Sequence, residues 1–393
     1  MQAVPEQLLE RVRGELETIP AIDHHAHVLG REEGPFSLGD DAAPLSEFVL
    51  ESNDPVAAVR HVRHHPSYGR AMGDLGRLLG APPEESAIAH AREAEGYAAY
   101  TRRLMAAAGL GAMFIDDGIR GLDLLTPPEQ GALVGIPWRR VLRIETVVQD
   151  AAGGWPSFDG VQASFGSAVS AALEDGLVAL KTIAAFRCGL DLPAPNKEEA
   201  AAGYERWRRT GSARVTDPAV ISFFVFEALR LTEQRRLPLQ VHTGLVGTDI
   251  DLRAGDPAPL RTLLALPAMN EVPVVLLHCY PFIREASWLA GLFSNVYLDL
   301  CMVLQWVVHR GPDLIREALD VAPVSKLLFA TDGFRVPELF YLGAKWWRDD
   351  LAHVLAGFID RGFVDEVRAV EWGGFVLRDN ALRIYPFGEE QRT

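Results

Sequence analysis

Short apolar runs alternate along the chain with segments whose apolar residues recur at helical spacing. Eight such runs, rich in Val, Ile and Leu, occupy residues 22–27, 112–115, 141–147, 178–183, 237–242, 272–278, 296–300 and 327–331. Strands that are buried on both faces read as continuous apolar runs, and their alternation with helices indicates a parallel sheet. Eight strand–helix units in 393 residues favour a closed (β/α)8 TIM barrel over an open sheet. We therefore expect one α/β domain over residues 1–393.

The gap between the first and second runs is longer than one strand–helix unit requires. It contains a stretch, residues 86–108, that is rich in Ala, Glu and Arg at helical spacing. In a barrel, the loop after a strand lies on the carboxyl-terminal face, where active sites are built. We predict that residues 31–110 form a helical insertion that caps the site. A shorter helical excursion, residues 197–214, follows the fourth run.

The first run ends in the string Asp-His-His-Ala-His, residues 23–27. Residues two apart in a strand point to the same side, so His25 and His27 can bind one ion together. We expect His24, between them, to be an ordinary polar loop residue. A His-X-His pair alone is a moderate indication of a metal site.

Three further strand ends carry metal-binding side chains. The fifth run ends in His242, the sixth ends in His278, and Asp332 follows the eighth. A lone histidine is more often a core residue that is hydrogen-bonded to a neighbour. Because parallel strands direct their ends to one mouth of a barrel, four strands ending in this way favour a metal site instead. Imidazole suits several divalent ions, so we expect zinc first, with manganese, iron or nickel as alternatives, and one or two ions per chain.

With these ligands in this order, the chain resembles the amidohydrolase superfamily over about residues 22–385. That superfamily carries His-X-His on its first strand, His on its fifth and sixth, and Asp on its eighth. Local strings resemble its amidohydrolase-related branch, whose domains occur alone or fused to glutamine-synthetase-like modules: His242-Thr-Gly244, His278-Cys-Tyr-Pro281-Phe, Asn295-Val-Tyr-Leu-Asp299 and Asn380-Ala-Leu-Arg-Ile-Tyr385. The resemblance implies a metal-dependent hydrolase that cleaves an amide, ester or lactone bond of a small molecule. It also implies that Asp332 accepts the proton of the water and passes it to the leaving group, and that His278 binds metal or stabilises the developing oxyanion.

Lys181, near the end of the fourth run, is open to several interpretations. An unpaired charge on a buried strand is costly, so the side chain requires a partner or a modification. Binuclear members of the superfamily carry a carbamylated lysine here that bridges two metals, and the resemblance implies that role for Lys181. Pairing with Glu145, binding of substrate, and support of a metal ligand are the alternatives. A single-metal decarboxylase or isomerase is the alternative reaction, and a catalytically silent ligand-binding or scaffold domain is the alternative of another class.

Three residues are candidates for substrate contact. Arg187, on the loop after the fourth run, has the guanidinium that clamps a carboxylate through two hydrogen bonds. Glu145, placed at the end of the third run beside Arg143, is either a further ligand or the partner of a basic residue. Trp207 is a candidate pocket wall, although packing between helices is the usual fate of such a side chain. Asp116, after the second run, is expected on the polar rim or in a turn.

Charge and composition restrict the partners. The net charge of 38 − 53 = −15 argues against nucleic acid, because phosphate would be repelled. Cys188, Cys279 and Cys301 are odd in number and far apart, so a disulfide framework is not expected. The first ten residues lack the apolar segment of a signal peptide, and no run is long enough to span a bilayer. We expect a cytoplasmic protein that acts on a small molecule, without a membrane partner, and in which a homo-oligomer is possible.

Overall fold

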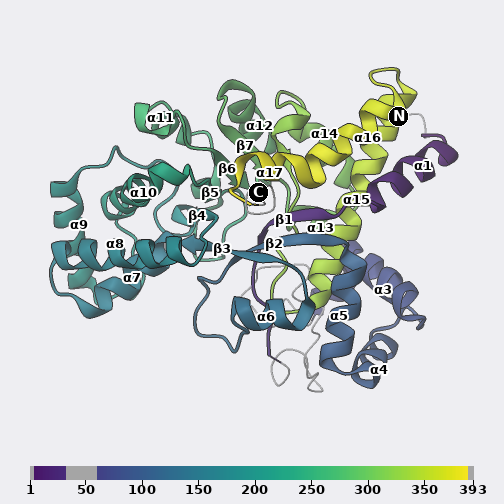
Figure 1. The fold of residues 1–393 in the computed structure, drawn as a ribbon, viewed down its shortest axis with the longest axis horizontal. Helices are drawn as coiled ribbons and strands as arrows, with labels where there is room; N and C mark the ends of the chain where they lie inside the picture. Colours follow the sequence, from purple (N-terminus) through teal and green to yellow (C-terminus); the bar gives the residue numbers. More distant parts are fainter. Residues whose placement is uncertain (1–3, 32–59, 388–393) are drawn as a thin grey trace.

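Eight parallel strands form one sheet in which each strand pairs with the next along the chain (Figure 1). The computed structural model describes residues 4–31 and 60–387. The strands are β1 Ala21–Ala26, β2 Leu110–Asp116, β3 Trp138–Arg143, β4 Ala179–Thr182, β5 Leu239–His242, β6 Val274–Leu277, β7 Val296–Asp299 and β8 Leu327–Leu328. Backbone hydrogen bonds join the last strand region to the first, with His27 N donating to Gly333 O (2.8 Å) and Asp332 N to His25 O (3.0 Å). The expected (β/α)8 barrel is confirmed.

Helices surround the sheet. The α-helices are α1 Glu6–Glu17, α3 Pro66–Leu79, α4 Glu85–Glu95, α5 Tyr97–Ala108, α6 Pro127–Val134, α7 Ile144–Gly154, α8 Phe158–Glu174, α9 Lys197–Thr210, α10 Pro218–Thr232, α11 Leu260–Leu264, α12 Ile283–Leu292, α13 Val303–Trp306, α14 Gly311–Ala318, α15 Pro337–Asp360, α16 Glu366–Gly374 and α17 Asn380–Ile384. Short helical turns are η2 Val62–His64, η3 Ala184–Phe186, η4 Glu233–Arg235, η5 Leu252–Gly255, η6 Pro267–Met269, η7 Val324–Lys326 and the π-helical η8 Phe375–Asp379. Within the described residues, none of these helices combines the length and apolar character needed to cross a membrane.

Local sequence explains where several helices begin and end. α6 begins with a capping box, in which the Thr126 hydroxyl accepts from Glu129 N and the Glu129 carboxylate accepts from Thr126 N. α10 begins at a proline after Asp217, whose carboxylate accepts from two first-turn amides. α5 ends at Gly109, which adopts φ 62°, a conformation that glycine reaches without a steric penalty. The chain then turns directly into β2.

The third apolar run does not remain a strand to its end. β3 stops at Arg143, and α7 begins at Ile144. Glu145 therefore lies in the first turn of a helix, and its expected place at a strand end is wrong. The run 141–147 is apolar in both halves, and continuous apolar character does not separate a buried strand from the start of a buried helix.

The described part of the long insertion packs beside the barrel, against α15 (Figure 1). Trp346 Nε1 on α15 donates to Asp74 Oδ2 on α3 (2.7 Å), and Tyr100 OH on α5 donates to Glu338 Oε1 (2.9 Å). All four side chains are buried. Residues 32–59 lie outside the described residues, so a cap formed by that segment stays a prediction.

Candidate metal centre

The carboxyl ends of β1, β4, β5, β6 and β8 converge on one cavity of about 230 Å³. The structure brings together on its wall all six side chains that the sequence proposed as metal ligands: His25, His27, Lys181, His242, His278 and Asp332. Ile119, Arg143, Ile183, Phe186 and Arg187 complete the lining. The polar groups therefore converge at the mouth where parallel barrels place their chemistry.

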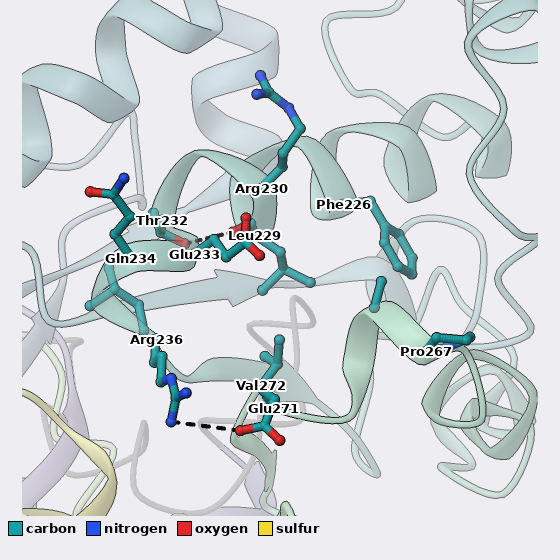
Figure 2. A pocket seen from close by; sticks show the side chains of 12 residues that line it. Phe226, Leu229, Arg230, Thr232, Glu233, Gln234, Arg236, Pro267, Glu271 and Val272 are labelled. Atoms are coloured by element: carbon teal, nitrogen blue, oxygen red, sulfur yellow. Dashed lines mark hydrogen bonds and ion pairs between the residues drawn. The ribbon is translucent and has the colours of Figure 1, made fainter.

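A larger cavity of about 620 Å³ lies at the other end of the barrel (Figure 2). It is lined by the end of α10, by η4, and by residues that precede β5 and β6, and its wall includes the ion pair of Arg236 with Glu271 (3.6 Å). No histidine or cysteine is among its lining residues. Because the metal-binding side chains and the strand ends are at the smaller cavity, we assign the chemistry there despite its size.

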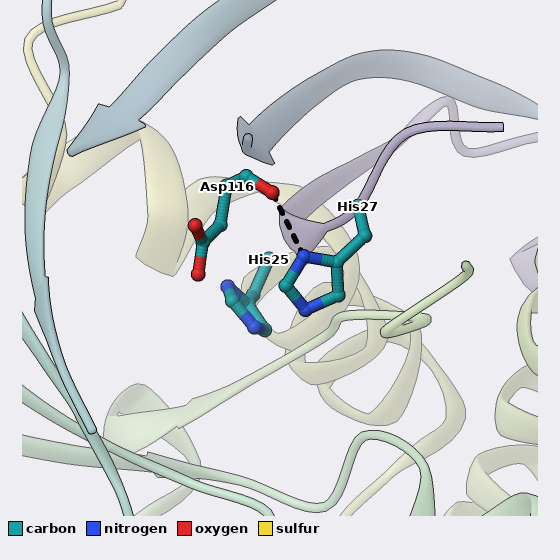
Figure 3. A group of neighbouring side chains, drawn as sticks. All are labelled: His25, His27 and Asp116. Carbon is teal, nitrogen blue, oxygen red and sulfur yellow. Dashed lines mark hydrogen bonds between the residues drawn. The ribbon is translucent and has the colours of Figure 1, made fainter. Parts of the chain in front are cut away.

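His25, His27 and Asp332 lie close together in the cluster. Nε2 of His25 and Nε2 of His27 each lie 3.4 Å from Asp332 Oδ1. His27 Nδ1 donates to the backbone oxygen of Asp116 (2.8 Å), as Figure 3 shows. Since a carbonyl only accepts, the proton of His27 is on Nδ1, which leaves the Nε2 lone pair directed toward Asp332.

The other two histidines lie on the neighbouring strand ends. The rings of His242 and His278 are in tilted contact, with centroids 4.4 Å apart. His242 Nε2 donates to Leu245 O (2.5 Å), so its Nδ1 is the nitrogen with a free lone pair. His278 Nδ1 lies 3.7 Å from Asp332 Oδ2 and 3.1 Å from the Cys301 sulfur. His278 and Asp332 both have positive φ, 67° and 53°, and such strained residues concentrate at functional sites.

The electrostatics favour the protonation states that bind a metal. Burial, followed by the charge of Lys181, lowers the pKa of His25 to about 3. Burial also lowers the pKa of His242 and of His278. Burial alone would raise the pKa of Asp332, but the neighbouring His278, His25 and His27 outweigh burial, and the net shift of that pKa is downward. Neutral imidazoles and an ionised carboxylate are the forms in which these groups are ligands.

Lys181 is buried, and its Nζ lies 3.1 Å from His25 Nε2. The alternative in which it pairs with Glu145 is wrong. The Glu145 carboxylate accepts from the Thr182 hydroxyl (2.5 Å) and from Ile183 N (3.0 Å), so it anchors the end of β4. Glu145 is also absent from the cavity lining, and its candidacy for substrate contact is not supported. Its place in the first turn of α7, rather than on a strand, directs it to the β4 backbone.

Two more expectations are corrected by burial. His24 is fully buried instead of belonging to a polar loop, with Nε2 2.9 Å from Asp299 Oδ2 and Nδ1 3.0 Å from Tyr385 OH. Asp116 is also fully buried, so its expected place on the rim is wrong, whereas the turn alternative holds, since its Oδ1 accepts from Gly118 N (2.9 Å). Its Oδ2 accepts from Arg143 Nε (3.0 Å) and Nη2 (2.7 Å). A signal for both was present, since Asp116 directly follows the apolar run 112–115 and Asp299 lies within the run 296–300.

The structure supports one of the two other candidates for substrate contact and not the other. Arg187 lines the cavity, as its loop position suggested. Trp207 does not line it, because its indole packs edge-on against Tyr204 and donates to Ser212 O (2.9 Å). That tryptophan connects α9 to the loop that follows, and its predicted role as a pocket wall is not supported.

The donor set fits a divalent cation. Two groups have ligand atoms within 4.8 Å of one another, namely His25, His27 and Asp116, and His278, Cys301 and Asp332. The Asp116 carboxylate is already bound by Arg143, so Asp332 is the better partner for the β1 histidines. Asp332 Oδ1 and His25 Nδ1 are buried and have no hydrogen-bond partner among the described residues. Imidazole nitrogen with carboxylate oxygen is the set that zinc and similar ions take.

The chain is similar to known proteins in sequence and in fold. Protein fluG of Emericella nidulans is 27% identical over 97% of this chain and 47% of its own length, so the chain spans about half of that curated relative. A candidate metal-dependent hydrolase from Lactobacillus casei has a solved structure with TM-score 0.86 at 27% identity, covering 97% of this chain and 98% of that one. Uronate isomerase of Thermotoga maritima, at 15% identity, TM-score 0.69 and 97% and 98% coverage, shares the fold. The family model described as amidohydrolase matches residues 161–387, more than half of the chain, and the chain therefore belongs to the amidohydrolase family.

Proposed function

We propose that this protein is a metal-dependent hydrolase that uses activated water to cleave an amide, ester or lactone bond of a small molecule. The observation that carries the proposal is the convergence of His25 and His27 on Asp332, at 3.4 Å each, with His242 and His278 on the same wall. The family membership and the likeness to the Lactobacillus casei candidate hydrolase support it.

Each residue of the site has its own role in the proposed reaction. A divalent cation bound here would lower the pKa of water toward neutrality and polarise a substrate carbonyl. Asp332 is held at the strand end by its own amide, which donates to His25 O (3.0 Å), and its low pKa keeps it ready to accept the water proton. It then passes that proton to the leaving nitrogen or oxygen. His278, which faces Asp332, either completes the ligand set or steadies the negative charge that develops on the carbonyl oxygen.

We further propose that Lys181 is carbamylated and that the site holds two ions. The amine would add to CO2, forming the N–C bond and releasing one proton, and the resulting carbamate would offer two oxygens that share one negative charge. Two observations support the modification: Lys181 lines the cavity with its Nζ 3.1 Å from His25 Nε2, and it forms no ion pair with any described residue. Burial lowers the pKa of Lys181, which favours the neutral amine that the addition needs.

Metal stoichiometry tests the proposal first. Protein purified without chelator is analysed for bound metals per chain, and ¹³C NMR after exposure to ¹³CO2 reports a carbamate, with Lys181→Met as the control. Two metals and a carbamate signal that the variant lacks are the expected result, together with turnover of a panel of N-acyl amides, esters and lactones. One metal without a carbamate would contradict the binuclear centre. CO2 release or isomerisation without hydrolysis would replace the proposed reaction by the decarboxylase or isomerase alternative.

A further inference from the structure

Two arginines lie on one side of the cavity although the chain as a whole is acidic. Arg143 ends β3, and Arg187 follows η3 on the loop after β4. Both line the cavity, and Asp332 is the one acidic side chain among its described lining residues. Arg143 is paired with Asp116, so Arg187 carries the positive charge that is available to a ligand.

Arg187 differs from Arg143 in that it forms no ion pair with a described carboxylate, and the charges of Glu145 and Asp249 act on it only from a distance. Arg143 is held by Asp116 through two hydrogen bonds, at 3.0 and 2.7 Å. The Nε of Arg187 is buried without a hydrogen-bond partner in the part of the chain that the structure describes, and its Nη1 makes a long contact with Phe186 O (3.4 Å). No described carboxylate forms an ion pair with Arg187. The Arg187 side chain is partly buried and its Nε has no hydrogen-bond partner among the described residues, so an anionic ligand would complete its contacts.

The loop that carries Arg187 is held in place before any ligand arrives. The amides of Arg187, Cys188 and Gly189 all donate to Ala184 O, at 2.8, 2.9 and 3.0 Å. From the outside, Arg214 donates to Phe186 O (3.0 Å) and pairs with Asp249. A side chain on a fixed backbone loses less entropy when it binds a ligand, so this loop is prepared for recognition.

We propose that Arg187, with Arg143 beside it, binds a carboxylate of the substrate and so places the reacting bond at the metal-binding histidines. This inference rests on the proposed function, whose substrate class it names: a small acid that carries a hydrolysable bond. A planar carboxylate matches the fork of one guanidinium through two parallel hydrogen bonds. The cavity of about 230 Å³ is smaller than the roughly 300–1,000 Å³ of pockets for drug-sized ligands, which favours a compact acid over a polyphosphate.

The test measures binding without requiring turnover. Metal-loaded protein is titrated calorimetrically with succinate and glutarate, with glutaramide as the neutral analogue and inorganic phosphate as the other oxyanion. Arg187→Met removes the charge and keeps the stem, and Arg187→Lys keeps the charge without the fork. Arg120→Met is the matched control, because Arg120 is exposed and does not line the cavity. Bound metal and the melting temperature are recorded for every variant, so that misfolding or metal loss is recognised.

We expect a dicarboxylate to bind and glutaramide to bind far more weakly. Arg187→Met should weaken the binding of the dicarboxylate by about ten- to hundredfold, which is the usual contribution of a charge-assisted hydrogen bond. The affinity of Arg187→Lys should fall between those of the parent protein and Arg187→Met. Arg120→Met should stay within about twofold. Unchanged affinity in a folded, metal-loaded Arg187→Met protein would overturn the proposal, as would phosphate binding tighter than either acid. Carboxylate binding that depends on Arg187 without any hydrolysis would refute the proposed function alone, whereas hydrolysis of neutral amides untouched by Arg187→Met would refute the carboxylate site alone.

Discussion

Replacing Arg143 by methionine removes the partner of a carboxylate that has no access to water. Asp116 is fully buried, and both of its hydrogen bonds from Arg143 end on Oδ2. Breaking a buried pair from one side costs about 3–5 kcal/mol, because the remaining charge is left uncompensated. The Arg143 side chain is 13% exposed and Gly118 N still donates to Asp116 Oδ1, so we expect the lower end, about 3 kcal/mol.

That loss of unfolding free energy corresponds to a decrease in the melting temperature. Unfolding entropy of about 2.1 cal/mol/K per residue gives roughly 0.8 kcal/mol/K for a chain of this length, so about 3 kcal/mol corresponds to about 4 °C. Differential scanning calorimetry and urea unfolding at pH 7 measure the change. Adding Asp116→Asn to Arg143→Met should recover at least half of the lost stability, because the uncompensated charge is then removed.

The chain offers a matched control three residues earlier. Arg140 pairs with Asp117 (3.1 Å) just as Arg143 pairs with Asp116, but both of those side chains are partly exposed, at 32% and 23%. Arg140→Met should therefore cost less than about 1 kcal/mol. Equal losses in the two single variants, or a double variant as unstable as Arg143→Met, would refute the reasoning that burial of Asp116 sets the cost.

Three further predictions follow from the site and from α15. Asp332→Asn should keep the circular dichroism spectrum and abolish turnover, because the amide cannot accept the water proton; activity close to that of the parent protein would contradict its role. Removing metal with a chelator should lower the melting temperature, and adding zinc should restore it, since a ligand of the native state stabilises that state; a temperature independent of metal would argue against a bound ion. Burial raises the pKa of Asp350 to about 7, so ionising this carboxyl destabilises the folded state, and the free energy of unfolding should fall as pH rises from about 4 through 7. Asp350→Asn should flatten that part of the pH profile and raise the melting temperature at pH 8. An unchanged pH profile in the variant would show that Asp350 titrates normally.

The sequence by itself determined the barrel and the gathering of the candidate metal ligands. His25, His27, His242, His278 and Asp332 each stand at or just beyond the end of an apolar run, and parallel strands in one sheet direct those ends to the same mouth. Arg187 could be placed at the cavity for the same reason, since it lies on the loop that follows β4. Both placements follow from the order of strands, helices and loops along the chain, and that order can be read from the hydrophobic pattern.

Tertiary structure decided what each side chain faces. Glu145 and Arg143 are near neighbours in sequence, yet one binds the β4 backbone and the other binds Asp116, because the chain changes from strand to helix between them. His24 was buried by Asp299 and Tyr385, which reach it from distant parts of the chain. Contacts of this kind depend on strand register and on the direction of each side chain. Neither is encoded in local hydrophobic spacing, so the partners of buried polar groups emerge only when the barrel closes.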